Sequence, residues 1–86
     1  MDHLQKARQL FLDALALQGK GDFAQAGHLY EKALELAPQR TSVMNNLATI
    51  YLELERCAEA RLLCDRVLEI DANDEVALVN LGNCQL

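Results

Sequence analysis

The chain has 86 residues, of which 51% are hydrophobic, and it carries a formal net charge of −5 with a pI near 4.8. This length suits one small domain, and so high an apolar fraction argues against a disordered chain. The acidic balance argues against a nucleic-acid partner, because nucleic-acid binding normally needs a basic face.

The sequence shows no targeting, membrane or metal signal. The first residues lack the apolar core of a signal peptide, and no apolar run reaches the ~18–20 residues that span a bilayer. Cys57 and Cys64 are seven residues apart, about 10 Å along a helix, which is too far for a disulfide. The histidines and cysteines lack the paired short spacings of a zinc site. We therefore predict free cysteines, no cofactor, no metal, no membrane contact and a cytoplasmic location.

The first part of the chain predicts two helices. Apolar residues at spacings of three and four indicate a helix over residues 3–19. The turn Gly19-Lys20-Gly21 ends it, and Asp22 can cap a second helix over 22–37. Pro38 closes that helix, because it disfavours helical backbone angles in the residue before it.

The rest of the chain predicts three more helices with the same kind of apolar spacing. Thr41 and Ser42 offer a cap for the first of them, and Asp74 offers a cap for the last. The expected ranges are 42–54, 57–70 and 75–86.

The chain repeats itself with a period of 34 residues. Ala26 is matched by Ala60, and Asn46-Leu47-Ala48 returns as Asn80-Leu81-Gly82. Such a period, built from two helical segments, predicts a stack of helical hairpins with a concave surface.

This pattern resembles the tetratricopeptide repeat (TPR) family. In a first repeat the resemblance is carried by Leu10, Ala14, Leu17, Gly21, Phe23, Ala26, Tyr30, Ala33 and Pro38. In a second it is carried by Met44, Leu47, Ala48, Tyr51, Ala60, Val67 and Leu68, and a third opens with Leu78, Leu81 and Gly82. Asp13, Glu55 and Ala72 depart from the family pattern. The resemblance implies an all-α fold, a right-handed superhelical stack of antiparallel helix hairpins with about five helices.

We expect one domain over residues 1–86, with repeats over 7–40 and 41–74 and a partial repeat over 75–86. Leu78 and Leu81 would then lack a sixth helix to cover them, whereas solenoids normally close with a polar-faced helix. The chain is therefore expected to be the amino-terminal part of a longer protein, or to self-associate through its last helix.

The first helix of each hairpin lines the inner, concave side of such a stack, and this side is the candidate peptide-binding groove. Its expected lining is Arg8, Phe11, Leu12, Leu15, Asn45, Asn46, Thr49, Asn80 and Asn83. An Asn side chain offers two donors and an acceptor, so Asn46 and Asn80 could hold the backbone of an extended peptide. The alternative is that both are solvent-facing or take part in structural hydrogen bonds. Arg8 is the main charge expected there.

Leu12 and Leu15 also have two interpretations. With Leu4 they make the first helix apolar on more than one side, which fits a broad core stripe. They also point away from the face that bears the repeat residues, which favours a surface for a partner protein.

Some family members bind the acidic carboxyl terminus of heat-shock chaperones through Lys, Asn and Arg side chains. The corresponding places here hold Phe11, Leu15, Asn46, Val76 and Asn80. Only Asn46 fits, and without cations nothing there pairs with a carboxylate. We do not expect that binding mode.

No catalytic constellation is visible, because no Ser, His and acid have a plausible arrangement and no phosphate-binding loop follows a strand. The predicted function is a non-catalytic protein–protein interaction module that binds a peptide or helix in its groove. The alternative is a substrate-recruiting repeat domain of a larger glycosyltransferase- or methyltransferase-type enzyme, whose catalytic part lies beyond Leu86.

Overall fold

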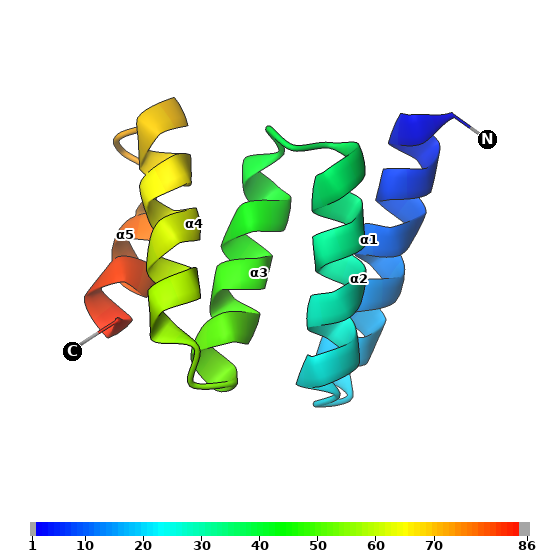
Figure 1. Ribbon diagram of the computed structural model, residues 1–86, viewed down its shortest axis with the longest axis horizontal. Coiled ribbons are helices and arrows are strands. Elements are labelled where there is room, and N and C mark those ends of the chain that lie inside the picture. The colour runs from blue at the N-terminus through cyan, green and yellow to red at the C-terminus, as the bar shows by residue number, and fades with distance from the viewer. Residues whose placement is uncertain (1, 85–86) are drawn as a thin grey trace.

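The structure is a computed structural model that describes residues 2–84. Over this range the chain forms five helices and no strand, which confirms the predicted fold class (Figure 1). The helices are α1 (His3–Gly19), α2 (Phe23–Leu36), α3 (Thr41–Glu53), α4 (Cys57–Ile70) and α5 (Glu75–Asn83). Predicted and observed bounds differ by at most one residue for the first four helices. The fifth begins at Glu75 as predicted, but it ends at Asn83 with Cys84 as its C-cap, whereas the sequence predicted that it continues to residue 86.

The helices form a stack in which each packs against the next along the chain, and α3 also packs against α5. In Figure 1 the two chain ends lie at opposite sides of the molecule, with α1 behind α2 and α5 behind α4. We call the surface carried by α1, α3 and α5 the inner face, and the surface carried by α2 and α4 the outer face.

Aspartate side chains cap three of the helices. Asp2 accepts a hydrogen bond from Gln5 N at 2.7 Å at the start of α1. Asp22 and Asp74 cap α2 and α5 in the same way, as predicted. The predicted capping of α3 by Thr41 or Ser42 is wrong. Thr41 is already helical and the cap position is Arg40, which makes no side-chain capping bond.

Small residues bring the helices close together. Ala26 and Ala60 are fully buried, as expected for tight helix contacts. Gly27 was not singled out from the sequence, yet a Cβ atom at this position would lie 3.0 Å from Ile50 Cγ2. The closeness of α2 to α3 therefore depends on a residue without a side chain. Its counterpart one period later is Arg61, which is exposed.

The two turns inside the hairpins have the same backbone conformation despite different residues. Gly21 has φ 81° and Glu55, 34 positions later, has φ 60°. Glycine adopts this left-handed region freely, whereas a residue with a Cβ atom loses about 1–2 kcal/mol there. The departure at Glu55 thus leaves the turn geometry unchanged at some cost in stability.

The cysteines are free thiols, as predicted: Cys64 and Cys84 are buried and Cys57 is half-buried. Burial, with smaller contributions from Cys84 and nearby carboxylates, raises the pKa of Cys64 to about 11. A protonated, enclosed thiol of this kind behaves as a small apolar core residue.

Candidate peptide-binding face

Two hollows lie on the inner face, one on each side of α3. The first hollow, about 460 Å³, lies between α1 and α3 and is lined in part by Arg8, Phe11 and Leu12. The second hollow, about 580 Å³, lies between α3 and α5 and is lined in part by Thr49, Asn80 and Asn83. Of the nine residues predicted to line the groove, three therefore gather at each hollow. The remaining three line neither: Leu15, Asn45 and Asn46.

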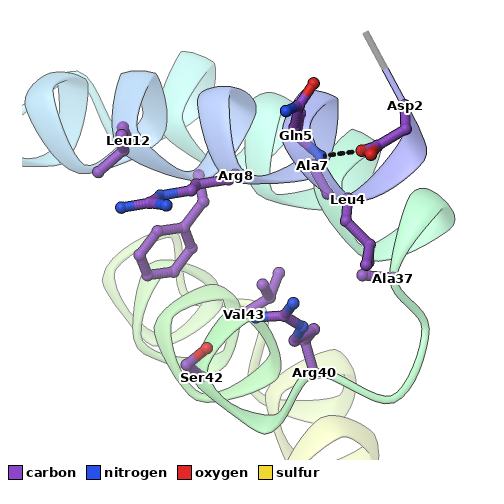
Figure 2. A pocket seen from close by; sticks show the side chains of 11 residues that line it. Asp2, Leu4, Gln5, Ala7, Arg8, Leu12, Ala37, Arg40, Ser42 and Val43 are labelled. Carbon is purple, nitrogen blue, oxygen red and sulfur yellow. Dashed lines mark hydrogen bonds between the residues drawn. The ribbon is translucent and has the colours of Figure 1, made fainter.

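Apolar side chains line much of the first hollow (Figure 2), and the ring of Phe11 among them packs against α2. Phe11 is half-buried, and its ring meets Tyr30 of α2 edge-on with 5.7 Å between the ring centroids. The Tyr30 hydroxyl donates a hydrogen bond to Gln18 Oε1 at 2.6 Å. Leu4 and Leu12 are exposed at the rim. The ring of Phe11 is thus a fixed wall of the hollow rather than a mobile surface residue.

Two arginines lie at the first hollow. Arg8 comes from α1, and Arg40 comes from the turn before α3 (Figure 2). Within residues 2–84, neither guanidinium has an ion pair or a hydrogen bond to another group. The one acid at the hollow, Asp2, has a carboxylate oxygen engaged with Gln5 N. The hollow therefore carries two arginines against one carboxylate, an excess of one positive charge, in a protein whose net charge is −5.

Arg40 and Leu4 were not predicted to belong to the site. Arg40 precedes the first residue of α3, and Ser42, two positions on, also lines the hollow. Arg40 lies directly before α3, which begins at Thr41. The sequence had predicted a start one residue later, with Thr41 or Ser42 as the cap. Arg8 is therefore joined by a second cation.

The second hollow is bordered by a hydrogen-bond network that joins α3 to α5. Asn80 Nδ2 donates to Thr49 Oγ1 at 3.1 Å and to the Asn45 carbonyl oxygen at 3.4 Å. Thr49 Oγ1 donates to the same carbonyl at 3.1 Å. Asn45 Nδ2 donates to Asp74 Oδ1, also at 3.1 Å, and Asp74 is the cap of α5.

This network corrects the expectation that Asn80 presents its amide to a ligand, and it also engages Asn45, which was predicted to line the groove. Only 7% of Asn45 and 6% of Asn80 are exposed, and the amide donors of both are used inside the protein. The structural alternative left open by the sequence describes Asn80 better, because α3 packs directly against α5 and the amide bridges them. Asn80 is therefore not free to hold a peptide backbone together with Asn46.

Asn46 occupies a different environment from Asn80. It is half-buried on α3 next to Tyr30: burial raises the pKa of Tyr30, and the side chain of Asn46 opposes that shift. Leu15 and Asn83 are exposed. Of the two asparagines predicted to hold a peptide backbone, Asn46 is therefore the one that remains partly accessible.

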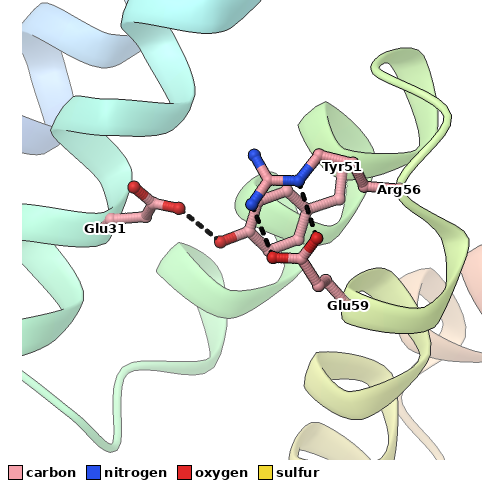
Figure 3. A network of polar contacts seen from close by, with 4 residues as sticks. All are labelled: Glu31, Tyr51, Arg56 and Glu59. Carbon is pink, nitrogen blue, oxygen red and sulfur yellow. Dashed lines mark hydrogen bonds and ion pairs between the residues drawn. The ribbon is translucent and has the colours of Figure 1, made fainter.

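The outer face has a groove of its own, of about 700 Å³, between α2 and α4. At one end the Tyr51 hydroxyl donates to Glu31 at 2.5 Å, and burial together with Glu31 raises the pKa of Tyr51 (Figure 3). The Arg56 guanidinium lies 4.4 Å above the Tyr51 ring and pairs with Glu59. The carboxylates that line the groove are Glu31, Glu35, Glu59, Asp65 and Glu69. The polar network connects α2, α3 and α4. The five carboxylates make the groove acidic.

Among residues 2–84 no group of three or more His, Cys, Asp or Glu side chains is placed to hold a metal ion. In the same part of the chain, none of the helices combines the length and the apolar character needed to cross a bilayer.

Comparison with known proteins identifies the family. Residues 17–81, more than half of the chain, match the tetratricopeptide repeat family profile. The chain therefore belongs to the tetratricopeptide repeat family.

Curated relatives are longer proteins. The chain is 33% identical over 84 residues to the photosystem I assembly protein Ycf3 of Synechococcus sp. (strain CC9605), covering 91% of this chain and 47% of the relative. It is 37% identical over 57 residues to the uncharacterized protein ycf37 of Pyropia yezoensis, covering 66% of this chain and 32% of the relative. It is 37% identical over 49 residues to stress-induced-phosphoprotein 1 of Caenorhabditis elegans, covering 57% of this chain and 15% of the relative. The chain thus spans less than half the length of each.

Solved structures share the fold. The first TPR of Spaghetti (RPAP3), bound to the HSP90 peptide SRMEEVD, has a TM-score of 0.88 at 22% identity, covering 94% of this chain and 64% of that one. The Arabidopsis OM64 TPR domain has a TM-score of 0.92 at 19% identity, covering 96% and 69%. At these identities the likeness establishes the fold alone.

Proposed function

We propose that this chain is a non-catalytic protein-interaction module whose inner face binds a peptide or helix of a partner protein. The observation that carries the proposal is the row of exposed apolar side chains along that face. Leu12 is 48% exposed and Leu15 40% on α1, and Val76 and Val79 are 50% and 62% exposed on α5. Exposed apolar side chains of this size are typical of an interaction site.

The comparisons support peptide binding as the kind of function. The first TPR of Spaghetti has an HSP90 peptide bound, and it shares the fold over nearly the whole of this chain. The positions that would hold the carboxyl terminus of such a peptide carry apolar Phe11, Leu15 and Val76 here, and Asn80 is used internally. We therefore propose that this chain binds a different segment, without a carboxylate at the middle of the inner face.

The proposal is tested with a phage-displayed peptide library, followed by titration of the purified hits. Leu15→Ser and Val79→Ser should each weaken a hit by about fivefold or more, because each removes apolar area that binding would bury. Leu62→Ser is the matched control, since Leu62 is also an exposed apolar residue but lies in the outer groove. Hits that lose affinity only with Leu62→Ser would contradict the proposal.

Self-association through α5 stays a prediction. Leu78 is 49% exposed on this helix, so its apolar side chain is available for contact with a second copy. Sedimentation velocity should then show a concentration-dependent dimer that Leu78→Ser abolishes. A monomer at every concentration would contradict it.

A further inference from the structure

We infer that the first hollow of the inner face binds a partner segment in which an apolar side chain is flanked by the carboxylates of Asp or Glu. This inference rests on the proposed function, because it names the chemistry of the partner for the same face. It is carried by the contrast between an apolar lining and two unpaired arginines in an acidic protein.

The hollow can accept an apolar side chain. Ala7, Ala37 and Val43 are buried around it, Phe11 forms a wall, and Leu4 is exposed at the rim. Its volume of about 460 Å³ falls in the range of small-ligand pockets, ~300–1,000 Å³. An apolar side chain placed here would remove both its own surface and that of Leu4 from water.

The pairing of the arginines sets this hollow apart from the rest of the molecule. Arg56 pairs with Glu59, Arg61 donates to the Cys84 carbonyl, and Arg66 donates to the Pro38 carbonyl. Within residues 2–84, the two arginines without such a partner are those at the hollow (Figure 2). Three of five guanidiniums thus have roles inside the fold, and the other two are available to a ligand at one place.

A carboxylate is the group that these arginines suit. The planar guanidinium binds carboxylates through two parallel hydrogen bonds, which makes it selective as well as attractive. The helix α3 starts beside the hollow without a side-chain cap, so its positive end adds to the same field. Because Arg8 and Arg40 come from different elements, one carboxylate on each side of the apolar residue fits the arrangement.

This site differs from the one with which some family members bind an acidic carboxyl terminus. That site would use the positions of Phe11, Leu15, Asn46, Val76 and Asn80, whereas Arg8 and Arg40 are outside that set. The carboxylates bound here would lie at the amino-terminal end of α1 and α3. They would also belong to side chains within a segment, so a free carboxyl terminus is not required.

The test uses blocked, fluorescein-labelled nonapeptides in which a central Leu is flanked on both sides by Glu, by Gln or by Lys. Fluorescence anisotropy with the full chain should show saturable binding of the Glu peptide below about 1 mM and about tenfold weaker binding of the Gln peptide. Raising the salt from about 50 to 300 mM should weaken the Glu peptide, because exposed charges are screened.

Two charge-matched variants separate the site from overall charge. Arg8→Gln combined with Arg40→Gln should weaken the Glu peptide about tenfold, and each single change about threefold. Lys20→Gln combined with Lys32→Gln removes the same charge at exposed residues away from the hollow and should leave affinity unchanged. Far-UV circular dichroism should show the same helicity for all variants.

The outcomes distinguish this inference from the proposed function. If the Glu peptide does not bind, binds no better than the Gln peptide, or ignores the arginine changes, the inference is overturned. Library hits that remain sensitive to Leu15→Ser would then leave the proposed function standing. If the Lys peptide binds best and Leu62→Ser abolishes it, the partner is basic and uses the acidic outer groove, which overturns both.

Discussion

The two hollows of the inner face differ in what their polar side chains do. At the second hollow, Asn80 and Thr49 are hydrogen-bonded to each other across α3 and α5. At the first hollow, the guanidiniums of Arg8 and Arg40 make no hydrogen bond or ion pair within residues 2–84. Polar side chains of the inner face therefore stabilise the fold at the second hollow and remain available for binding at the first.

Helix packing explains the difference. At the second end α3 lies against α5, so an amide on α5 reaches the backbone of α3. At the first end α1 packs mainly against α2, and the ring of Phe11 meets Tyr30 of that helix. Where neighbouring inner helices pack against each other, polar side chains hydrogen-bond across the interface, and where they do not, the polar side chains stay free of such bonds.

The largest expected effect comes from removing the amide at the second hollow. Asn80→Ala should lower the free energy of unfolding by ~1–3 kcal/mol, because it leaves the Asn45 carbonyl and Thr49 hydroxyl with one partner fewer in a buried place. Urea denaturation followed by circular dichroism measures this change. Asn83→Ala, an exposed position in the same helix, should change stability by less than about 0.5 kcal/mol. Equal midpoints for the two variants would mean that the network contributes nothing.

A double-mutant cycle sharpens the comparison. Thr49→Val and Asn80→Ala remove the two ends of one hydrogen bond, so their effects should not add, with a coupling free energy of ~0.5–1.5 kcal/mol. The same cycle between Arg8→Gln and Arg40→Gln should give a coupling near zero in stability. Coupling of similar size in both pairs would show that the two ends do not differ as the structure indicates.

The sequence predicted the helices better than it predicted their side-chain roles. The 34-residue period and the apolar spacing depend on backbone geometry, so they placed the first four helices and the start of the fifth within a residue of their observed bounds. The role of Asn80 depends on the distance between α3 and α5, which no periodicity encodes. Arg40 was missed for a related reason, since its contribution depends on α1 lying across a turn that is distant in sequence.

The buried thiol of Cys64 should make the free energy of unfolding depend on pH in the alkaline range. The pKa of Cys64 is raised from 9.0 to about 11, mainly by burial. In the unfolded chain the thiol ionises near pH 9 while the folded protein keeps its proton, so stability should fall as pH rises from 9 to 11 and should be unaffected below that range. Cys64→Ala should flatten this fall in urea denaturation experiments.

Cys57→Ala is the control for this prediction, because Cys57 is only half-buried. The fall between pH 9 and 11 should persist in this variant. A Cys64→Ala protein with an unchanged pH profile would assign the fall to other groups, of which the buried thiol of Cys84, whose pKa burial also raises, is the first to consider.

The smallest expected effect concerns stability at the first hollow. Arg8→Gln combined with Arg40→Gln should change the free energy of unfolding by less than about 0.5 kcal/mol, because neither guanidinium contacts a polar partner within residues 2–84. The double change takes the net charge from −5 to −7, two cations fewer, and this modest increase in repulsion is screened at physiological salt. Urea denaturation beside the Asn80→Ala protein gives the comparison in one experiment. A loss above about 1 kcal/mol would mean that the arginines serve the fold, and the hollow would then resemble the second end.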